Sequence, residues 1–193
     1  MQFTTSTLAA ILAFTSSTVA TPLQARQNAL QDWKVTGVAV GTPSGRPGSY
    51  PWSSITANIT DPNEINLGTA QSDGSTVIVP AGSQGINCVA KYFSKGGETP
   101  LGRTWPCDPV EDGYWTMKVL AGSSGSYSST NFNLKFTHVA DLVYQGSQYT
   151  ASFEGEGHFE VGNQLAGTCG GSGVCGWGLA PGKNPVLVKA NKI

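Results

Sequence analysis

Residues 130–161 contain two runs of alternating apolar and polar side chains separated by a turn signal. Phe132, Leu134 and Phe136 alternate with polar residues in the first run, and the second run repeats this pattern after the turn. A period of two places alternate side chains on opposite faces of a sheet. The sequence Gln145-Gly146-Ser147 is typical of the turn that joins two such strands. The stretch therefore predicts a long antiparallel hairpin with one buried face, which other strands must cover.

Short runs of strand-like composition lie between clusters of turn-forming residues along the rest of the chain. Gly37 interrupts the first of these runs and predicts a bulge or bend. Ile86 shares one parity with Cys88, Ala90 and Tyr92, so we expect these four side chains on one face. Outside the hairpin, the predicted strands are 33–40, 53–60, 75–79, 85–93, 114–121 and a last strand near 186–188.

The overall composition agrees with a fold made of strands. Charged residues make up 12% of the chain, and there are 25 glycines. Val139 to Tyr144 is the one helical candidate after the N-terminal segment, and it is too short to change the class. The pattern predicts an all-β fold, a compact antiparallel β-barrel or sandwich of about seven to eight strands stapled by two disulfides.

The first residues have the marks of a secretion signal. Leu8 to Phe14 is a short apolar run, and Thr18-Val19-Ala20 offers the small residues that a signal peptidase requires. We predict a signal peptide at 1–20, a short pro-segment at 21–26 that ends at an arginine, and a single secreted β domain at 27–193. The apolar run is too short to span a membrane. The formal charge of −1 and the lack of a basic cluster exclude a typical nucleic-acid partner.

The four cysteines of an exported chain predict two disulfides. Of the three connectivities, we favour the two local pairs, Cys88 with Cys107 and Cys169 with Cys175. The alternative, a metal site, is disfavoured because no histidine pair lies near Cys169 and Cys175. Asn58-Ile59-Thr60 is a glycosylation sequon on the polar face of a predicted strand, so Asn58 is a candidate glycosylation site.

Glu154, Glu156, His158 and Glu160 form a stripe on the polar face of the second hairpin strand. Alternate residues of a strand lie about 7 Å apart, a spacing that suits the paired carboxylates of a glycosidase. A histidine between acids also suits a divalent metal. The third interpretation is a solvated polar face, which antiparallel sheets commonly have, and we favour it.

Tryptophans supply a second kind of candidate site. Trp105, Trp115 and Trp177 are candidates for a sugar-stacking platform, and burial in the core is the more common alternative for so large a ring. The sequence contains no Gly-x-Ser-x-Gly elbow, no Walker loop and no dinucleotide fingerprint. We therefore assign no catalytic residue, no metal and no cofactor.

The order of these features resembles the fungal Alternaria major-allergen-like family, which includes secreted elicitors of plant cell death. The resemblance rests on the signal and pro-segment, Trp33-Lys34-Val35, Cys88 within 85–90, Trp105-Pro106-Cys107, Tyr149-Thr150-Ala151-Ser152 and a late cysteine pair. It implies a compact β-barrel with two intramolecular disulfides. Cys169 and Cys175 are closer together than the family's second pair. No cysteine precedes Cys88 to link two subunits, so we expect a monomer or a non-covalent dimer.

The resemblance implies recognition at or outside host cells, with no catalytic centre common to the family. We expect a secreted, extracellular effector or elicitor that is allergen-like and non-enzymatic, with a host plant protein or cell-wall component as its partner. The alternative is a secreted carbohydrate-active or carbohydrate-binding protein that uses Glu154 and Glu156 or exposed tryptophans. A purely structural cell-wall protein is a third possibility.

Overall fold

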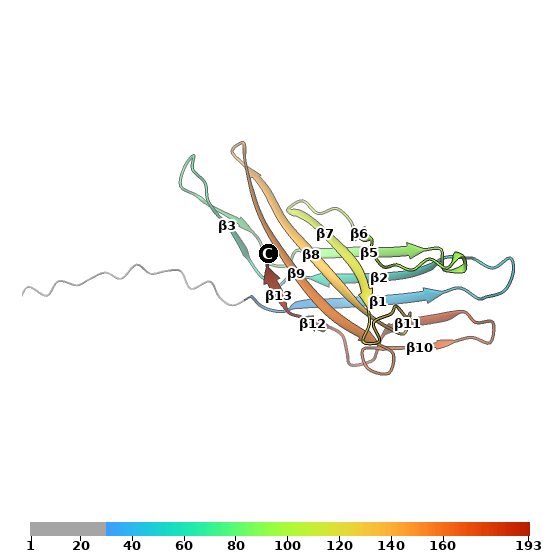
Figure 1. Ribbon diagram of the computed structural model, residues 1–193. Coiled ribbons are helices and arrows are strands. Elements are labelled where there is room, and N and C mark those ends of the chain that lie inside the picture. The colour runs from blue at the N-terminus through green and yellow to red at the C-terminus, as the bar shows by residue number, and fades with distance from the viewer. Residues whose placement is uncertain (1–29) are drawn as a thin grey trace, which may run out of the picture.

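The computed structural model describes residues 30–193, and these form an all-β fold (Figure 1). The strands are β1 Trp33–Thr42, β2 Ser53–Thr60, β3 Ile65–Thr69, β4 Thr76–Val79, β5 Gln84–Tyr92, β6 Thr104–Pro106, β7 Gly113–Ala121, β8 Asn131–Tyr144, β9 Ser147–Glu160, β10 Leu165–Cys169, β11 Cys175–Leu179, β12 Val186–Val188 and β13 Ala190–Lys192, with one short 3-10 helix, η1 Ser94–Gly96. One sheet has the order β10-β11-β1-β2-β5, with β12 also paired to β1. The second sheet has the order β13-β9-β8-β7-β6, and β3 and β4 form a separate hairpin.

The predicted antiparallel all-β class with two disulfides is confirmed, and the architecture is the sandwich. The two large sheets are not closed into a barrel. On one side the C-terminal segment connects them, because β12 pairs with β1 while β13 pairs with β9. On the other side the disulfide from Cys88 on β5 to Cys107, directly after β6, ties the edges together. Strand periodicity alone does not distinguish a sandwich whose sheet edges are connected in this way from a closed barrel.

The predicted long hairpin is β8 and β9, and it is confirmed. The two strands pair without interruption from Asn131 with Glu160 to Tyr144 with Ser147. Gln145 and Gly146 form the turn with φ values of 48° and 81°. Positive φ at both central residues is the type I′ geometry, which matches the twist of the flanking strands.

The helical prediction for 139–144 is wrong, because this segment is the end of β8. Val139 pairs with Ser152 and Leu142 pairs with Tyr149. Ala140 is fully buried between less buried neighbours, as the period of a strand requires. Cross-strand pairing therefore overrides the weak local preference of these residues.

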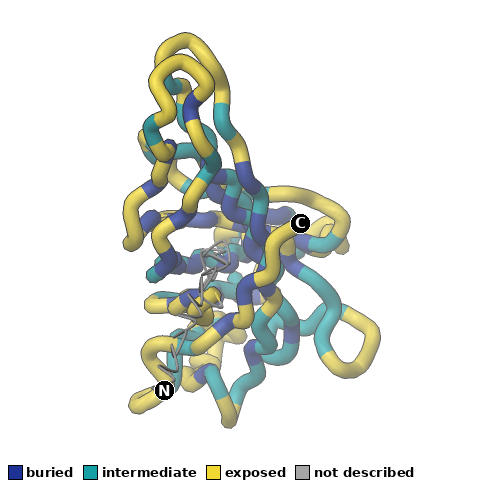
Figure 2. The backbone as a smooth tube through the Cα atoms, turned by 90° about the vertical axis from the view of Figure 1, so that its left-hand side faces the viewer, coloured by how far each residue is buried: buried dark blue, intermediate teal, exposed yellow. Residues whose placement is uncertain are grey.

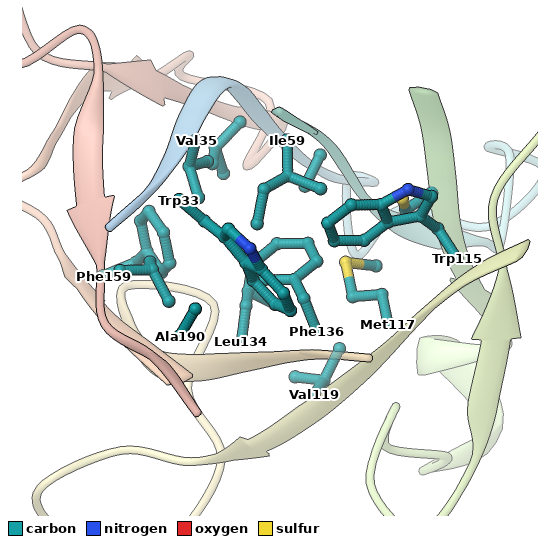
Figure 3. Close-up of a cluster of buried hydrophobic side chains, with 14 of the residues drawn as sticks. Trp33, Val35, Ile59, Trp115, Met117, Val119, Leu134, Phe136, Phe159 and Ala190 are labelled. Atoms are coloured by element: carbon teal, nitrogen blue, oxygen red, sulfur yellow. The ribbon is translucent and has the colours of Figure 1, made fainter. Parts of the chain in front are cut away.

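The core lies between the two large sheets, and apolar side chains from both of them fill it (Figure 3). The rings of Trp33 and Trp115 meet edge to face at 4.9 Å between centroids. Gly155 on β9 is required by this packing, since a Cβ there would lie 2.8 Å from Val188 and 3.1 Å from Trp33. Figure 2 shows most of the buried stretches toward the middle of the molecule and long exposed stretches in the projecting loops.

Two irregularities set which side chains face this core. Gly37 sits at a bulge between β1 and β2, as predicted. A second register shift separates Ala57 from Ile59 in the pairing with β5, where Asn87 has a φ of 51°. This shift turns Ile86 outward, and it is 40% exposed rather than buried with Cys88. The parity predicted for Ile86 is therefore wrong.

The strand number exceeds the prediction, with thirteen strands within residues 30–193. The strands that the sequence pattern missed are short or rich in glycine: β3, β6, β10, β11 and β13. The predicted signal peptide, the pro-segment and residues 27–29 lie outside the described residues. Within 30–193, no helix has the length and apolar character needed to cross a bilayer.

The tips of the two projecting hairpins are joined by one carboxylate. Asp73, in the β3–β4 turn, accepts hydrogen bonds from Tyr144, the last residue of β8, and from Gln145 in the turn that follows, each at 3.0 Å. Hydrogen bonds from Ser75, together with those from Tyr144 and Gln145, lower the pKa of Asp73 below its usual value. The carboxylate therefore stays ionised to a lower pH than an ordinary aspartate, and its hydrogen bonds join the two tips.

Candidate functional site

The acidic stripe on β9 lies opposite polar residues of β8. Glu154 contacts Lys135 Nζ at 2.5 Å, and Glu156 accepts a hydrogen bond from Asn133 at 2.7 Å. Asn131 donates to Glu160 at 2.9 Å. Each carboxylate thus has a partner on the neighbouring strand, which is the pattern of stabilising cross-strand pairs.

His158 belongs to the same ladder. Its Nδ1 lies 2.6 Å from Asn133 Oδ1, and its Nε2 lies 3.8 Å from Glu160. Within the described part of the chain, no group of three or more histidine, cysteine or acidic side chains is arranged to hold a metal ion. The contacts favour the interpretation of the stripe as a polar face.

The three tryptophans proposed as a platform do not come together as an exposed surface. Trp115 is 1% exposed and belongs to the core. Trp105 and Trp177 pack against the core, half-buried, with their indole nitrogens buried. The buried alternative therefore accounts for these rings.

A different pair of aromatic rings is exposed in the loop between β1 and β2. Tyr50 is 62% exposed and Trp52 is 39% exposed. The ammonium of Lys91, on β5, lies 5.5 Å from the centroid of the Tyr50 ring and 5.6 Å from that of Trp52. We call Tyr50, Trp52 and Lys91 the aromatic platform. Sequence reasoning missed it, although two aromatic residues in a loop without strand alternation were a usable signal.

The loop that carries the platform is held by several side-chain contacts. Lys95 in η1 donates hydrogen bonds to Ser49 Oγ at 2.7 Å and to the Arg46 carbonyl. Ser49 donates to the Ser44 carbonyl at 2.9 Å. Trp52 packs on Phe93 with 5.4 Å between ring centroids. These contacts hold the backbone that leads to Tyr50, and the packing on Phe93 holds the Trp52 ring.

A pocket of about 290 Å³ lies beside the platform. Tyr50 and Trp52 form part of its wall, and Val174 and Cys175 of the β10–β11 hairpin form another part. The Cys169–Cys175 disulfide holds that hairpin. Hydroxyl groups complete the lining, from Thr42, Ser44, Ser49 and Ser54. The lining contains no carboxylate, so the pocket offers apolar faces, hydroxyl partners and a nearby positive charge.

Figure 1 shows the end of β1, the start of β2, the end of β5 and the β10–β11 loop gathered at one end of the sandwich.

A second arrangement has the residue types of an acyl-transfer triad. His138 Nδ1 lies 3.1 Å from Asp61, and His138 Nε2 lies 3.3 Å from Ser83 Oγ. Ser83 also lines a pocket of about 440 Å³ together with Asp108 and Asp112.

The accessibility of His138 decides against catalysis at this arrangement. His138 is 0% exposed and does not line the pocket, so a leaving group has no route to its imidazole. Trp115 stacks on the imidazole at 4.2 Å and donates to Ser83 at 3.2 Å. We therefore interpret this group as a buried structural network.

Asn58, the glycosylation candidate, lies in the middle of β2. Its side chain is half-buried, and its Oδ1 accepts a hydrogen bond from the Asn87 backbone at 2.9 Å. Glycosylation at Asn58 stays a prediction.

Comparison of the chain with models of protein families, with curated proteins and with solved structures found no match.

Proposed function

We propose that this protein is a secreted, non-enzymatic recognition protein of the effector or elicitor type, related to the Alternaria major-allergen-like family. It acts outside plant host cells by contacting a host protein or cell-wall component through the aromatic platform. No cofactor takes part. The observation that carries the proposal is the exposure of Tyr50 and Trp52 on a loop fixed by Lys95 and Ser49. Aromatic side chains held in place on a surface are the usual anchors of protein recognition sites.

The proposed extracellular location agrees with the covalent structure. Both disulfides, Cys88–Cys107 and Cys169–Cys175, are compatible with an oxidising compartment. The predicted signal peptide points to the same location. A protein of this kind meets its partner in the extracellular space of the host tissue.

The alternative of a glycosidase at Glu154 and Glu156 is less well supported. Both carboxylates are engaged by residues of β8, Lys135 and Asn133. Glu154 is half-buried and Glu156 is exposed, so neither carboxylate lies in the enclosed apolar surroundings of a glycosidase acid. Carbohydrate binding without hydrolysis fits the aromatic platform better.

Infiltration of purified protein into leaf tissue tests the proposed function. Wild-type protein is expected to provoke a cell-death or defence response that a heat-unfolded sample does not provoke. Trp52→Ala and Tyr50→Ala are each expected to raise the dose needed for that response at least tenfold, since anchoring aromatics commonly contribute about 2 kcal/mol or more.

Three control variants distinguish the loss of a recognition surface from a loss of folding and from a loss of catalysis. Tyr114→Ala removes a 50% exposed ring from β7 and is expected to leave the response unchanged. Glu154→Gln and Glu156→Gln are expected to preserve both the response and stability, the latter within about 0.5 kcal/mol. A full response from Trp52→Ala and Tyr50→Ala would contradict the proposal. So would a glucan- or xylan-hydrolysing activity that either glutamine substitution abolishes.

A further inference from the structure

We infer that the aromatic platform binds a polysaccharide that contains uronic acid residues. In this interaction Tyr50 and Trp52 stack on the C–H faces of the sugar rings, and Lys91 pairs with a uronate carboxylate. The inference rests on the proposed function, because it names the chemistry of the partner at the same site.

The two exposed rings fit a sugar better than an apolar ligand. A pyranose has an apolar face of C–H groups and a rim of hydroxyl groups. The pocket beside the rings has matching chemistry, since Thr42, Ser44 and Ser54 supply hydroxyl partners around the faces of Tyr50 and Trp52. Its volume of about 290 Å³ is at the lower end of the range for small-ligand sites. The site thus suits a short segment of a chain that continues across the surface.

The charge of the site selects an acidic sugar. Lys91 Nζ lies over both rings, 5.5 Å from the Tyr50 centroid and 5.6 Å from the Trp52 centroid, so the ammonium covers part of each ring face and its positive charge lies at the platform itself. Among residues 30–193, Lys91 makes no salt bridge, and no carboxylate lines the pocket. An ammonium beside aromatic faces forms strong charge-assisted hydrogen bonds with a carboxylate.

Other charged side chains near the platform are also positive. Arg46 is exposed in the loop that carries the platform, and Lys95 is held at its base through Ser49. Glu98, which accepts a hydrogen bond from the Phe93 backbone, is paired with Arg103 at 3.2 Å. Lys91, Arg46 and Lys95 thus add positive charge near the platform, although the whole chain carries a formal charge of −1.

The test measures binding of the intact protein to soluble polysaccharides by affinity electrophoresis and calorimetry. Polygalacturonate is the probe. Its fully methyl-esterified form has the same sugar without the carboxylate charge. A neutral β-glucan contains no uronate at all. Polyglutamate is the control for charge without sugar, and alginate is a uronate from a source other than plants. Binding is expected to polygalacturonate, at least tenfold weaker to the methyl ester, and absent with polyglutamate. Alginate distinguishes a general uronate site, which binds it equally, from a site specific for galacturonate.

Variants then assign the binding to the platform. Lys91→Gln is expected to weaken polygalacturonate binding about tenfold, the usual effect of losing a hydrogen bond to a charged group. Trp52→Ala is expected to weaken binding to both the acid and the ester. Lys118→Gln removes an exposed lysine from β7 and serves as the control of equal charge, with no expected change. Unchanged thermal unfolding of each variant shows that the fold persists.

The outcomes separate this inference from the proposed function. Equal affinity for polygalacturonate and polyglutamate, or for the acid and the neutral glucan, overturns the assignment of a uronate ligand. If no polysaccharide binds while Trp52→Ala still loses the leaf response, the uronate inference fails and the recognition function stands, with a host protein as its partner. If polygalacturonate binds through Lys91 while Tyr50→Ala and Trp52→Ala keep the full leaf response, the proposed function fails instead.

Discussion

Replacing His138 with alanine is expected to lower the free energy of unfolding by about 3–5 kcal/mol. His138 is fully buried between Asp61 at 3.1 Å and Ser83 at 3.3 Å, and its ring stacks on Trp115. Removing the imidazole leaves Oδ2 of Asp61, which is 1% exposed, without its hydrogen-bond partner, while Oδ1 keeps its two bonds from Asn63. It also leaves a cavity beside Trp115. Both effects destabilise the folded state.

Urea unfolding followed by tryptophan fluorescence measures this loss, and the second histidine provides the control. His158 lies on the polar face of β9, with its side chain 36% exposed. Its replacement by alanine is expected to cost less than about 1 kcal/mol, as for other partly exposed polar contacts. Equal losses for the two variants would contradict the interpretation of Asp61, Ser83 and His138 as a structural network.

Removal of the Cys88–Cys107 disulfide by a double substitution to alanine is expected to cost about 3 kcal/mol of stability. The two cysteines are separated by 19 positions, so the crosslink restricts a sizeable loop in the unfolded chain. Cys88 is 0% exposed, and its bond joins the two sheets at their open side. The Cys169–Cys175 bond spans only 6 positions and ties a surface hairpin, so its removal is expected to cost about 2 kcal/mol.

The same unfolding experiment, performed on the two double variants under identical conditions, measures both costs. The Cys88 and Cys107 variant is expected to have the lower unfolding midpoint. It is also expected to expose apolar surface to a hydrophobic dye at lower urea concentrations. A larger loss of unfolding free energy for the Cys169 and Cys175 variant would show that the β10–β11 hairpin, rather than the crosslink between β5 and the end of β6, limits stability.

The sequence predicted those parts of the fold in which a period of two is long and uninterrupted. Phe132, Leu134 and Phe136 face the core as the pattern requires, and the turn at Gln145 has the predicted place. The prediction of buried and exposed faces failed where the alternation of a strand is interrupted. Ile86 changes face because the pairing between β2 and β5 shifts register, an effect that depends on the neighbouring strand.

Glycine-rich strands were also beyond sequence reasoning. In β11 Gly176 and Gly178 occupy the positions that would otherwise show alternation, and the strand exists because β1 and β10 pair with both of its edges. The choice between barrel and sandwich depends on which distant edges meet, and this is set by long-range pairing such as that of β13 with β9.

The candidate site illustrates the same limit. Glu154 and His158 stood out in the sequence because neighbouring residues of one strand are easy to compare, yet their partners lie on β8. Tyr50 and Lys91 are 41 positions apart and meet only because β2 places the loop beside β5. Asp61, Ser83 and His138 converge from three separate segments in the same way.

Hydroxyl-radical footprinting of the intact protein on isolated plant cell walls measures directly which side chains become covered on recognition. Tyr50 and Trp52 are expected to lose most of their oxidation in the presence of the walls, because the platform lies against the partner. Tyr114, which is 50% exposed on the second sheet, is expected to oxidise as in the free protein. Unchanged oxidation of Tyr50 and Trp52 together with protection of Tyr114 would contradict recognition through the aromatic platform.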